Sequence, residues 1–311
     1  MKYLALFAAV SGLALTSSGG GSSGGPPPSS GATPTPSPTP TPSPTPSPTP
    51  TPTSFTTLVF EDQFSASSLD RGKWNVEGPA FWVNNEAQAY IDSTETIFFD
   101  TPDGAEDGAL ILQPRWRPGY STPTGRTADF VSGRIDTANK FDTAFSRVAA
   151  RIRMPDARGA WPAFWMLGYG NWPDSGETDI MEYVGEKDWT SSALHGPGYS
   201  GGGNIGDRQY FPSGEDVTGW HIYAVEKRPD DIRFFVDDRE FLRISKNDVL
   251  ARGEWRFDRN QFIILNFALG GTYPQGVNGV TSPYAGLPQS TVDRIKANEL
   301  RMEIDWVRAW E

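Results

Sequence analysis

Beyond residue 55 the chain alternates between short apolar stretches and groups of turn-forming residues, a pattern that predicts many short β-strands. Residues 151–154 and 233–236 partly alternate polar and apolar side chains, as strands with one buried and one solvent-facing side do. The strands that we expect cover residues 57–60, 109–112, 146–154, 220–226, 231–236, 262–267 and 302–310. Residues 236–240 supply the turn of a hairpin, and residues 291–300 suit one short helix.

This pattern predicts an all-β domain. Many short antiparallel strands with regular turns are typical of a β-sandwich or jelly roll. Residues 55–311 are about as many as one such domain contains, so we assign them to a single folded unit. The chain has no cysteine, so the fold forms without disulfides, and thiol chemistry and cysteine-based zinc sites are excluded.

The first 54 residues have a different composition. Residues 1–18 combine Lys2, an apolar run and small residues, which predicts a secretory signal peptide, because the run is too short to span a bilayer. Ser18 stands where a lipoprotein signal would carry its lipidated cysteine. We therefore expect a secreted protein, tethered to the cell surface if the natural precursor has a cysteine at that position. Residues 19–54, rich in Gly and Ser and then in Pro, Thr and Ser, predict an extended linker.

The net charge of the chain limits the classes of molecule that it is expected to bind. The net charge is −11 and no basic block occurs, so nucleic acids and anionic membranes are poor candidates. Eleven tryptophans are present, and aromatic faces stack on sugar rings, although most tryptophans in a β-rich protein belong to the core. We expect a monomer with no protein partner.

Residues 177–182 contain three carboxylates, Glu177, Asp179 and Glu182. In a regular strand Glu177 and Asp179 share one face and Glu182 points to the other. A β-bulge near Ile180 and Met181 would return Glu182 to the shared face, and bulges often lie next to active sites. Crowded carboxylates repel each other, so we interpret them as a functional pair, one ionised nucleophile and one protonated acid, as glycoside hydrolysis requires. A solvent-exposed acidic strand, the structural alternative, would not need the bulge.

Segments around these carboxylates resemble glycoside hydrolase family 16, especially its laminarinase-like branch. The similar segments are Trp161-Pro162-Ala163-Phe164-Trp165-Met166-Leu167-Gly168, Trp172-Pro173, Gly176 to Glu182, and residues 84–88, 132–135, 194–196, 266–271 and 305–308. The resemblance covers about residues 57–311. It implies a curved β-sandwich jelly roll with a concave substrate cleft, and cleavage of internal β-glycosidic bonds with retention of configuration. The two residues between Asp179 and Glu182 match the laminarinase-like, agarase and carrageenase branches.

The resemblance assigns Glu177 as nucleophile and Glu182 as general acid/base, with Asp179 between them. A retaining mechanism needs two carboxyl groups about 5–5.5 Å apart, which agrees with this assignment. Neighbouring anions would raise the proton affinity of Glu182 and keep the acid protonated. The reaction needs no cofactor.

The resemblance also implies substrate-binding residues: Trp161, Trp165, Trp172, His195, Asn85 and Arg134, with Gln88 as a weaker member of the set. Several alternatives remain open at this point. Trp165 could belong to the core, Arg134 could pair with Asp136 or Glu86, and His195 could be structural, as we expect for His221.

Many members of the family bind a structural calcium ion far from the cleft. Its ligands would be the side chain of Asp305 and the carbonyl groups of Gln63 and Gly108, oxygen ligands of the kind that calcium prefers. Relatives often carry Glu at the position of Gln63. Asp305 as an ordinary ion-pair partner is the alternative.

The expected function is therefore a secreted, retaining endo-β-1,3-glucanase, a laminarinase, with mixed β-1,3/1,4-glucan as a further candidate substrate. One alternative is an agarase or carrageenase on the same catalytic strand, although a sulfated galactan calls for a cleft rich in Arg and Lys. The other alternative is a non-catalytic glucan-binding protein. Relatives of that kind lack the catalytic carboxylates. Glu177, Asp179 and Glu182 are all present here.

Overall fold

The computed structural model describes residues 54–311. The signal peptide expected at 1–18 and all but the last residue of the linker expected at 19–54 lie outside the described residues. Within the described residues, no helix is long and apolar enough to cross a membrane.

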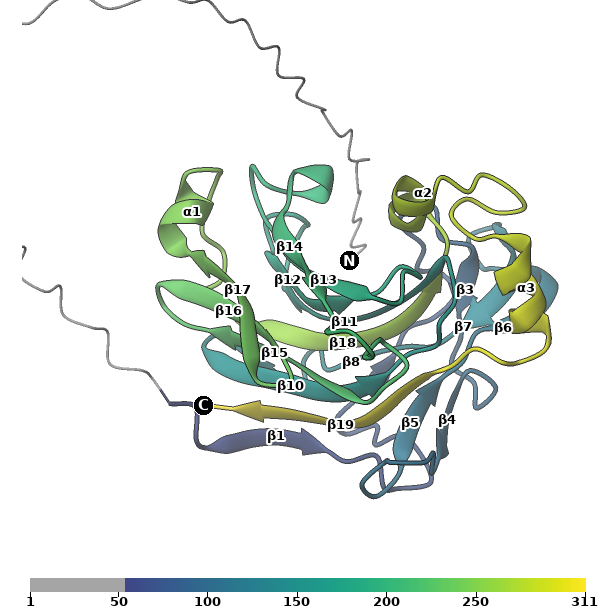
Figure 1. Ribbon diagram of the computed structural model, residues 1–311, viewed down its shortest axis with the longest axis horizontal. Helices are drawn as coiled ribbons and strands as arrows, with labels where there is room; N and C mark the ends of the chain where they lie inside the picture. The colour runs from purple at the N-terminus through teal and green to yellow at the C-terminus, as the bar shows by residue number, and fades with distance from the viewer. Residues whose placement is uncertain (1–53) are drawn as a thin grey trace, which may run out of the picture. The chain divides into compact units, whose positions relative to one another are not determined.

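Two eight-stranded antiparallel sheets lie against each other as two layers (Figure 1). The first sheet contains β1 (Leu58–Asp62), β4 (Ile97–Asp100), β5 (Ala109–Leu112), β10 (Ser146–Arg153), β15 (His221–Lys227), β16 (Asp231–Val236), β17 (Arg239–Ser245) and β19 (Met302–Trp310). The second contains β2 (Asn75–Val76), β8 (Arg134–Asp136), β9 (Asp142–Thr143), β11 (Ala160–Gly168), β12 (Glu177–Glu182), β13 (Trp189–His195), β14 (Ile205–Tyr210) and β18 (Gln261–Leu269). The predicted all-β sandwich is confirmed.

A smaller, three-stranded sheet flanks these layers. It consists of β3 (Gln88–Tyr90), β6 (Arg115–Ser121) and β7 (Thr127–Ser132), and the pairing of β3 with β7 is parallel. The helices are η1 (Gly201–Gly203), α1 (Lys246–Leu250), α2 (Thr272–Asn278) and α3 (Gln289–Lys296). The sequence pattern predicted α3 two residues late at its start and four residues late at its end. It missed α1 and α2, which are too short to show a helical period.

The core lies between the two large sheets. Alternate residues of β10, such as Val148 and Ile152, belong to the same buried cluster as Phe164 and Met166 of β11. Because side chains alternate across a strand, the residues between these positions on β11 face away from the core. The central strands β11 and β18 of the second sheet therefore present one face to the core and the other to the opposite side, where the polar residues gather.

The predicted β-bulge is confirmed in β12. Its pairing with β13 shifts register between Asp179 and Glu182, and its pairing with β11 shifts at the same place. The partners on β11 are Leu167 for Glu177, Trp165 for Asp179 and Ala163 for Glu182. These three partners are two residues apart and share one face, so the three carboxylates also share one face. The apolar Ile180 and Met181 pack in the core instead.

Candidate active site

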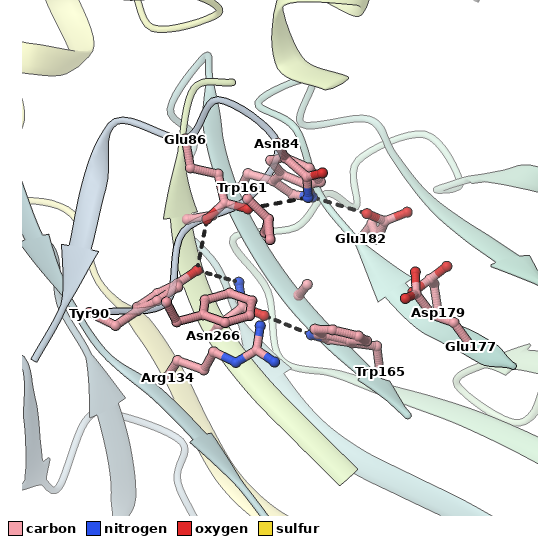
Figure 2. Close-up of a pocket in the computed structure, with 14 residues that line it drawn as sticks. Asn84, Glu86, Tyr90, Arg134, Trp161, Trp165, Glu177, Asp179, Glu182 and Asn266 are labelled. Atoms are coloured by element: carbon pink, nitrogen blue, oxygen red, sulfur yellow. Dashed lines mark hydrogen bonds between the residues drawn. The ribbon is translucent and has the colours of Figure 1, made fainter. Parts of the chain in front are cut away.

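The three carboxylates of β12 line one pocket on the non-core face of the second sheet (Figure 2). We call it the first pocket, and its lining residues are Phe81, Val83, Asn84, Glu86, Tyr90, Arg134, Trp161, Ala163, Trp165, Glu177, Asp179, Glu182, Asn266 and Ala268. They come from β3, β8, β11, β12, β18 and the loop before β3. The fold thus brings together residues that are almost two hundred positions apart in the sequence.

Two tryptophan side chains donate hydrogen bonds to Glu177 and Glu182, the first and last carboxylates of β12. The indole N–H of Trp172 donates to Oε2 of Glu177 at 3.0 Å, and that of Trp161 donates to Oε1 of Glu182 at 3.0 Å. Both residues were expected to contact sugar, and Trp161 also lines the first pocket. The structure places their N–H groups on the carboxylates, where each hydrogen bond favours the ionised form.

Burial raises the pKa of all three carboxyl groups, each to about 8. The negative charge of Asp179 raises the pKa of Glu177 and of Glu182 further, whereas His195 and the two indole N–H groups lower them. A hydrogen bond with Glu177 lowers the pKa of Asp179. Interacting groups of this kind titrate together, so the cluster retains at least one proton at neutral pH. That proton is what a general acid needs.

His195 contacts the central carboxylate. Its Nε2 lies 3.1 Å from Oδ2 of Asp179 and 3.8 Å from Oε1 of Glu177, and the ring is fully buried. The sequence predicted a contact with substrate, and the structure brings His195 to the carboxylates rather than into the apolar core. Glu177, Asp179 and His195 also offer three ligand atoms within 4.8 Å of one another.

A network of hydrogen bonds joins Trp165, Asn266 and Tyr90 in the first pocket (Figure 2). Trp165 donates its indole N–H to Oδ1 of Asn266 at 2.7 Å, and Nδ2 of Asn266 donates to the hydroxyl of Tyr90 at 3.2 Å. The hydroxyl of Tyr90 in turn donates to Glu86 at 3.3 Å. Trp165 is thus fixed by its polar end and turned toward the pocket, so the alternative that it belongs to the core is wrong.

Arg134 lies in the same pocket, stacked between two aromatic rings. The guanidinium carbon is 4.3 Å from the ring centre of Phe81 and 4.9 Å from that of Trp165. Among the described residues it forms no ion pair with Asp136 or Glu86, the two partners that the sequence left open. Its planar donors are therefore available to a ligand in the pocket.

Asn85 does not line the pocket, contrary to expectation. Its side chain is exposed, whereas the preceding residue, Asn84, lines the pocket and donates to Glu86 at 3.3 Å. Both asparagines have a positive φ, a backbone conformation in which Asn is enriched among the residues other than Gly. The sequence also missed Phe81, Tyr90 and Asn266. Asn266 belongs to a segment that carried the family resemblance, which was a usable signal.

A second pocket adjoins the first at Glu182. Its lining residues are Glu182, Ser191, Ser192, Ala193, Gly201, Gly202, Asn204, Gly206, Asp207, Arg208, Thr272, Tyr273, Gly276 and Val277. They come from β12, β13, β14, η1 and α2, so the loops beyond the sheet complete it. Glu182 is the one carboxylate of β12 that lines both pockets. A bond placed across the two pockets would lie next to it.

Asp305, the one side chain among the expected calcium ligands, is already engaged by other groups. Oδ1 of Asp305 accepts the backbone N–H of Glu106 at 2.9 Å, and Oδ2 accepts from the guanidinium of Arg151. Arg151 already neutralises this buried carboxylate, and its positive charge would repel a cation. The structure shows the alternative, an ordinary ion pair.

Comparisons with known proteins match this part of the chain. A family model described as Glycosyl hydrolases family 16 matches residues 74–307. The chain is 36% identical over 255 residues to a beta-glucanase of Rhodothermus marinus, which covers 77% of this chain and 84% of that protein. It is 30% identical over 271 residues to a glucan endo-1,3-beta-glucosidase of Cryptopygus antarcticus, covering 81% and 91%.

A solved structure has a similar fold. The catalytic domain of an endo-1,3-beta-glucanase (laminarinase) from Thermotoga petrophila RKU-1 superposes with a TM-score of 0.69 at 32% identity, covering 82% of this chain and 97% of that one. The region that the family model matches, 74–307, contains every residue that lines the two pockets.

Proposed function

The chain belongs to glycosyl hydrolases family 16 and is a glycoside hydrolase, and we propose that it is a retaining endo-β-1,3-glucanase that uses Glu177 and Glu182. One observation carries the assignment of roles. The β-bulge brings both carboxylates to one face, and of these two only Glu182 also borders the second pocket. Glu182 is thus placed to serve a leaving group, and Glu177 to serve the sugar in the first pocket.

The first step forms a covalent glycosyl-enzyme. With the sugar in the first pocket, Glu182 gives its proton to the glycosidic oxygen while a carboxylate oxygen of Glu177 attacks the anomeric carbon. The bond to the leaving oxygen breaks, and the released saccharide departs through the second pocket. Burial and the charge of Asp179 favour the protonated form of Glu182 before this step.

The second step is hydrolysis of that intermediate. A water molecule takes the place of the leaving saccharide, and Glu182, now ionised, removes its proton as the oxygen attacks the anomeric carbon. The bond to Glu177 breaks and its carboxylate is restored. Two displacements at the same carbon retain the configuration. The hydrogen bond from Trp172 stabilises Glu177 each time it is released as an anion.

The lining of the pockets supports an uncharged substrate. The first pocket contains four carboxylates, those of Glu86 and the three residues of β12, against one cationic side chain, Arg134. Trp161, Trp165 and Phe81 supply aromatic surface for sugar rings. A sulfated galactan would bring negative charge into an already acidic pocket, so β-1,3-glucan and mixed-linkage β-1,3/1,4-glucan suit it better. The named activities of the relatives point the same way. Secretion through residues 1–18 is part of this proposal.

The substrate assignment is tested by release of reducing ends from laminarin, lichenan, agarose and carrageenan. We expect rapid cleavage of laminarin into a range of oligosaccharides, slower cleavage of lichenan and none of the galactans. Proton NMR of the first products should show the β-anomer. Activity on a galactan alone, or an α-anomer as the first product, would contradict the proposal.

A further inference from the structure

Trp82 is the most exposed tryptophan of the chain. It is 43% exposed, whereas every other tryptophan is buried or half-buried. A single exposed aromatic residue is common and carries no inference by itself. The side chain of Trp82, however, is held at two points. Its indole N–H donates to the backbone carbonyl of Glu86 at 2.8 Å, and the guanidinium carbon of Arg126 lies 5.1 Å from its ring centre.

Arg126 is also fixed. It directly precedes β7, and its Nη2 donates to the backbone carbonyl of Gln88 on β3 at 2.6 Å. The stack of Arg126 on Trp82 therefore joins the loop before β3 to the small sheet of β3, β6 and β7 (Figure 1). A ring that is already held in one orientation loses little conformational entropy when a ligand stacks on it. Trp82 is thus a preformed platform for the apolar face of another ring.

The strand order of the second sheet places this platform at one end of the two pockets. That order is β14, β13, β12, β11, β18, β8 and β2. Residues of β12, β13 and β14 line the second pocket, and residues of β12, β11, β18 and β8 line the first. Trp82 belongs to the loop that follows β2, and its neighbours Phe81 and Val83 line the first pocket whereas Trp82 does not. Trp82 therefore lies just outside the first pocket, at the end away from the second.

We propose that Trp82 binds a glucosyl unit of the substrate outside the first pocket, on the non-reducing side of the unit that Glu177 attacks. This inference rests on the proposed function, in which the second pocket takes the leaving saccharide. The other part of a long glucan chain then leaves the first pocket at the end where Trp82 lies. Arg126 stacks on one face of the indole, so the sugar stacks on the other. Binding of such a remote unit helps to hold the cleaved bond at the carboxylates.

Binding of β-1,3-glucan oligosaccharides to the inactive variant Glu177→Gln tests the proposal without turnover. By calorimetry, adding Trp82→Ala to this variant should raise Kd for the hexasaccharide about tenfold, and Kd for the disaccharide much less. The same Kd for the hexasaccharide with and without Trp82 would overturn the proposal. If Glu177→Gln bound neither oligosaccharide, the proposed function would be contradicted, and the role of Trp82 with it.

Phe145→Ala is the matched control for the loss of an exposed aromatic side chain. Phe145 is 36% exposed, lies between β9 and β10, and lines neither pocket. Added to Glu177→Gln, this substitution should leave Kd for the hexasaccharide unchanged. A tenfold rise here too would show that the effect is not specific to Trp82, and the proposal would be wrong.

Cleavage of the hexasaccharide, labelled at its reducing end, gives a readout that a purely structural role would not move. Without the contact at Trp82, fewer units are held on the non-reducing side of the cleaved bond. In Trp82→Ala the main cleavage site should therefore move toward the non-reducing end, and the ratio of kcat/KM for the hexasaccharide to that for the trisaccharide should fall about tenfold. An unchanged product pattern, or an equal loss of kcat/KM on both oligosaccharides, would overturn the proposal.

Discussion

Trp172 donates its indole N–H to Oε2 of Glu177 at 3.0 Å, from a loop five residues upstream of the carboxylate in the sequence. Trp161 makes the corresponding contact with Glu182, but from the neighbouring strand β11. Each indole lowers the pKa of one carboxyl group, against the burial that raises it. The two proposed roles, nucleophile and acid, can therefore be altered separately without changing either carboxylate.

Trp172→Phe keeps an aromatic ring and removes the donor to Glu177. Glu177 must be ionised to attack, and the loss of this contact raises its pKa, so the acid limb of kcat/KM should move to higher pH. We expect kcat/KM at the optimum to fall about ten- to a hundredfold, the usual loss for a hydrogen bond to a charged group. The measurement is the pH dependence of laminarin hydrolysis.

Trp161→Phe is the matched control, because it removes the donor to Glu182. The pKa of the acid should rise, and the alkaline limb, rather than the acid limb, should move to higher pH. If both variants moved the same limb, the assignment of two distinct roles would be wrong.

Arg134→Ala should weaken substrate binding without slowing the chemical step. Arg134 lies in the first pocket, stacked between Phe81 and Trp165, and makes no contact with the reacting carboxylates. We expect KM for laminarin to rise about tenfold with kcat within about twofold, the pattern of a lost uniform binding contact. Arg134→Lys keeps the charge but not the planar stacking, so it should resemble Arg134→Ala. If Arg134→Lys had the KM of the parent enzyme, the charge of the side chain alone would account for its contribution to substrate binding.

His221 should make stability depend on pH. Burial lowers the pKa of His221, but its hydrogen bonds to Asp237 and to the carbonyl of Asp216 outweigh burial, and the pKa rises above 6.5. A raised pKa adds stability that is fully present below the pKa of the unfolded chain and is lost as pH rises through the folded value. The Tm of His221→Gln should therefore fall below that of the parent at about pH 5 and approach it at about pH 9. A constant difference would contradict the charged pair.

Lys227 should reduce stability at neutral pH. Its side chain is fully buried on β15, opposite Ser146 of β10, and burial lowers its pKa from 10.5 to about 7. The unfolded chain binds this proton more tightly, so the free energy of unfolding should rise with pH between these two values. Lys227→Met, of similar length, should raise Tm at neutral pH by about 4 °C. The gain should shrink toward pH 10, and a gain that stayed constant would point to packing instead of charge.

The sequence was sufficient for features that depend on near neighbours. Strands β5, β16 and β19 have the predicted bounds, because short apolar runs between turn residues are visible locally. The bulge was also predictable, since three carboxylates at 177, 179 and 182 can share a face only if one residue is added.

Features that depend on distant pairing were not predictable. Trp161 reaches Glu182 because β11 and β12 pair in one particular register, which the sequence does not reveal. The network from Trp165 through Asn266 to Tyr90 joins three strands far apart in the chain. Two adjacent asparagines have the same chemistry, so the sequence does not reveal that Asn84 rather than Asn85 lines the pocket. The ion pair that occupies Asp305 likewise required the pairing of β10 with β19.

The most direct test of the central claim is chemical rescue of Glu177→Ala and Glu182→Ala by azide, with a β-glucoside carrying an activated leaving group. Without Glu177, azide can attack the anomeric carbon from the vacated side in a single displacement. Without Glu182, the activated substrate still forms the glycosyl-enzyme, and azide attacks that intermediate from the opposite side. The account predicts an α-glycosyl azide from Glu177→Ala and a β-glycosyl azide from Glu182→Ala. The reverse pair of anomers, or unimpaired hydrolysis of laminarin by Glu177→Ala, would contradict it.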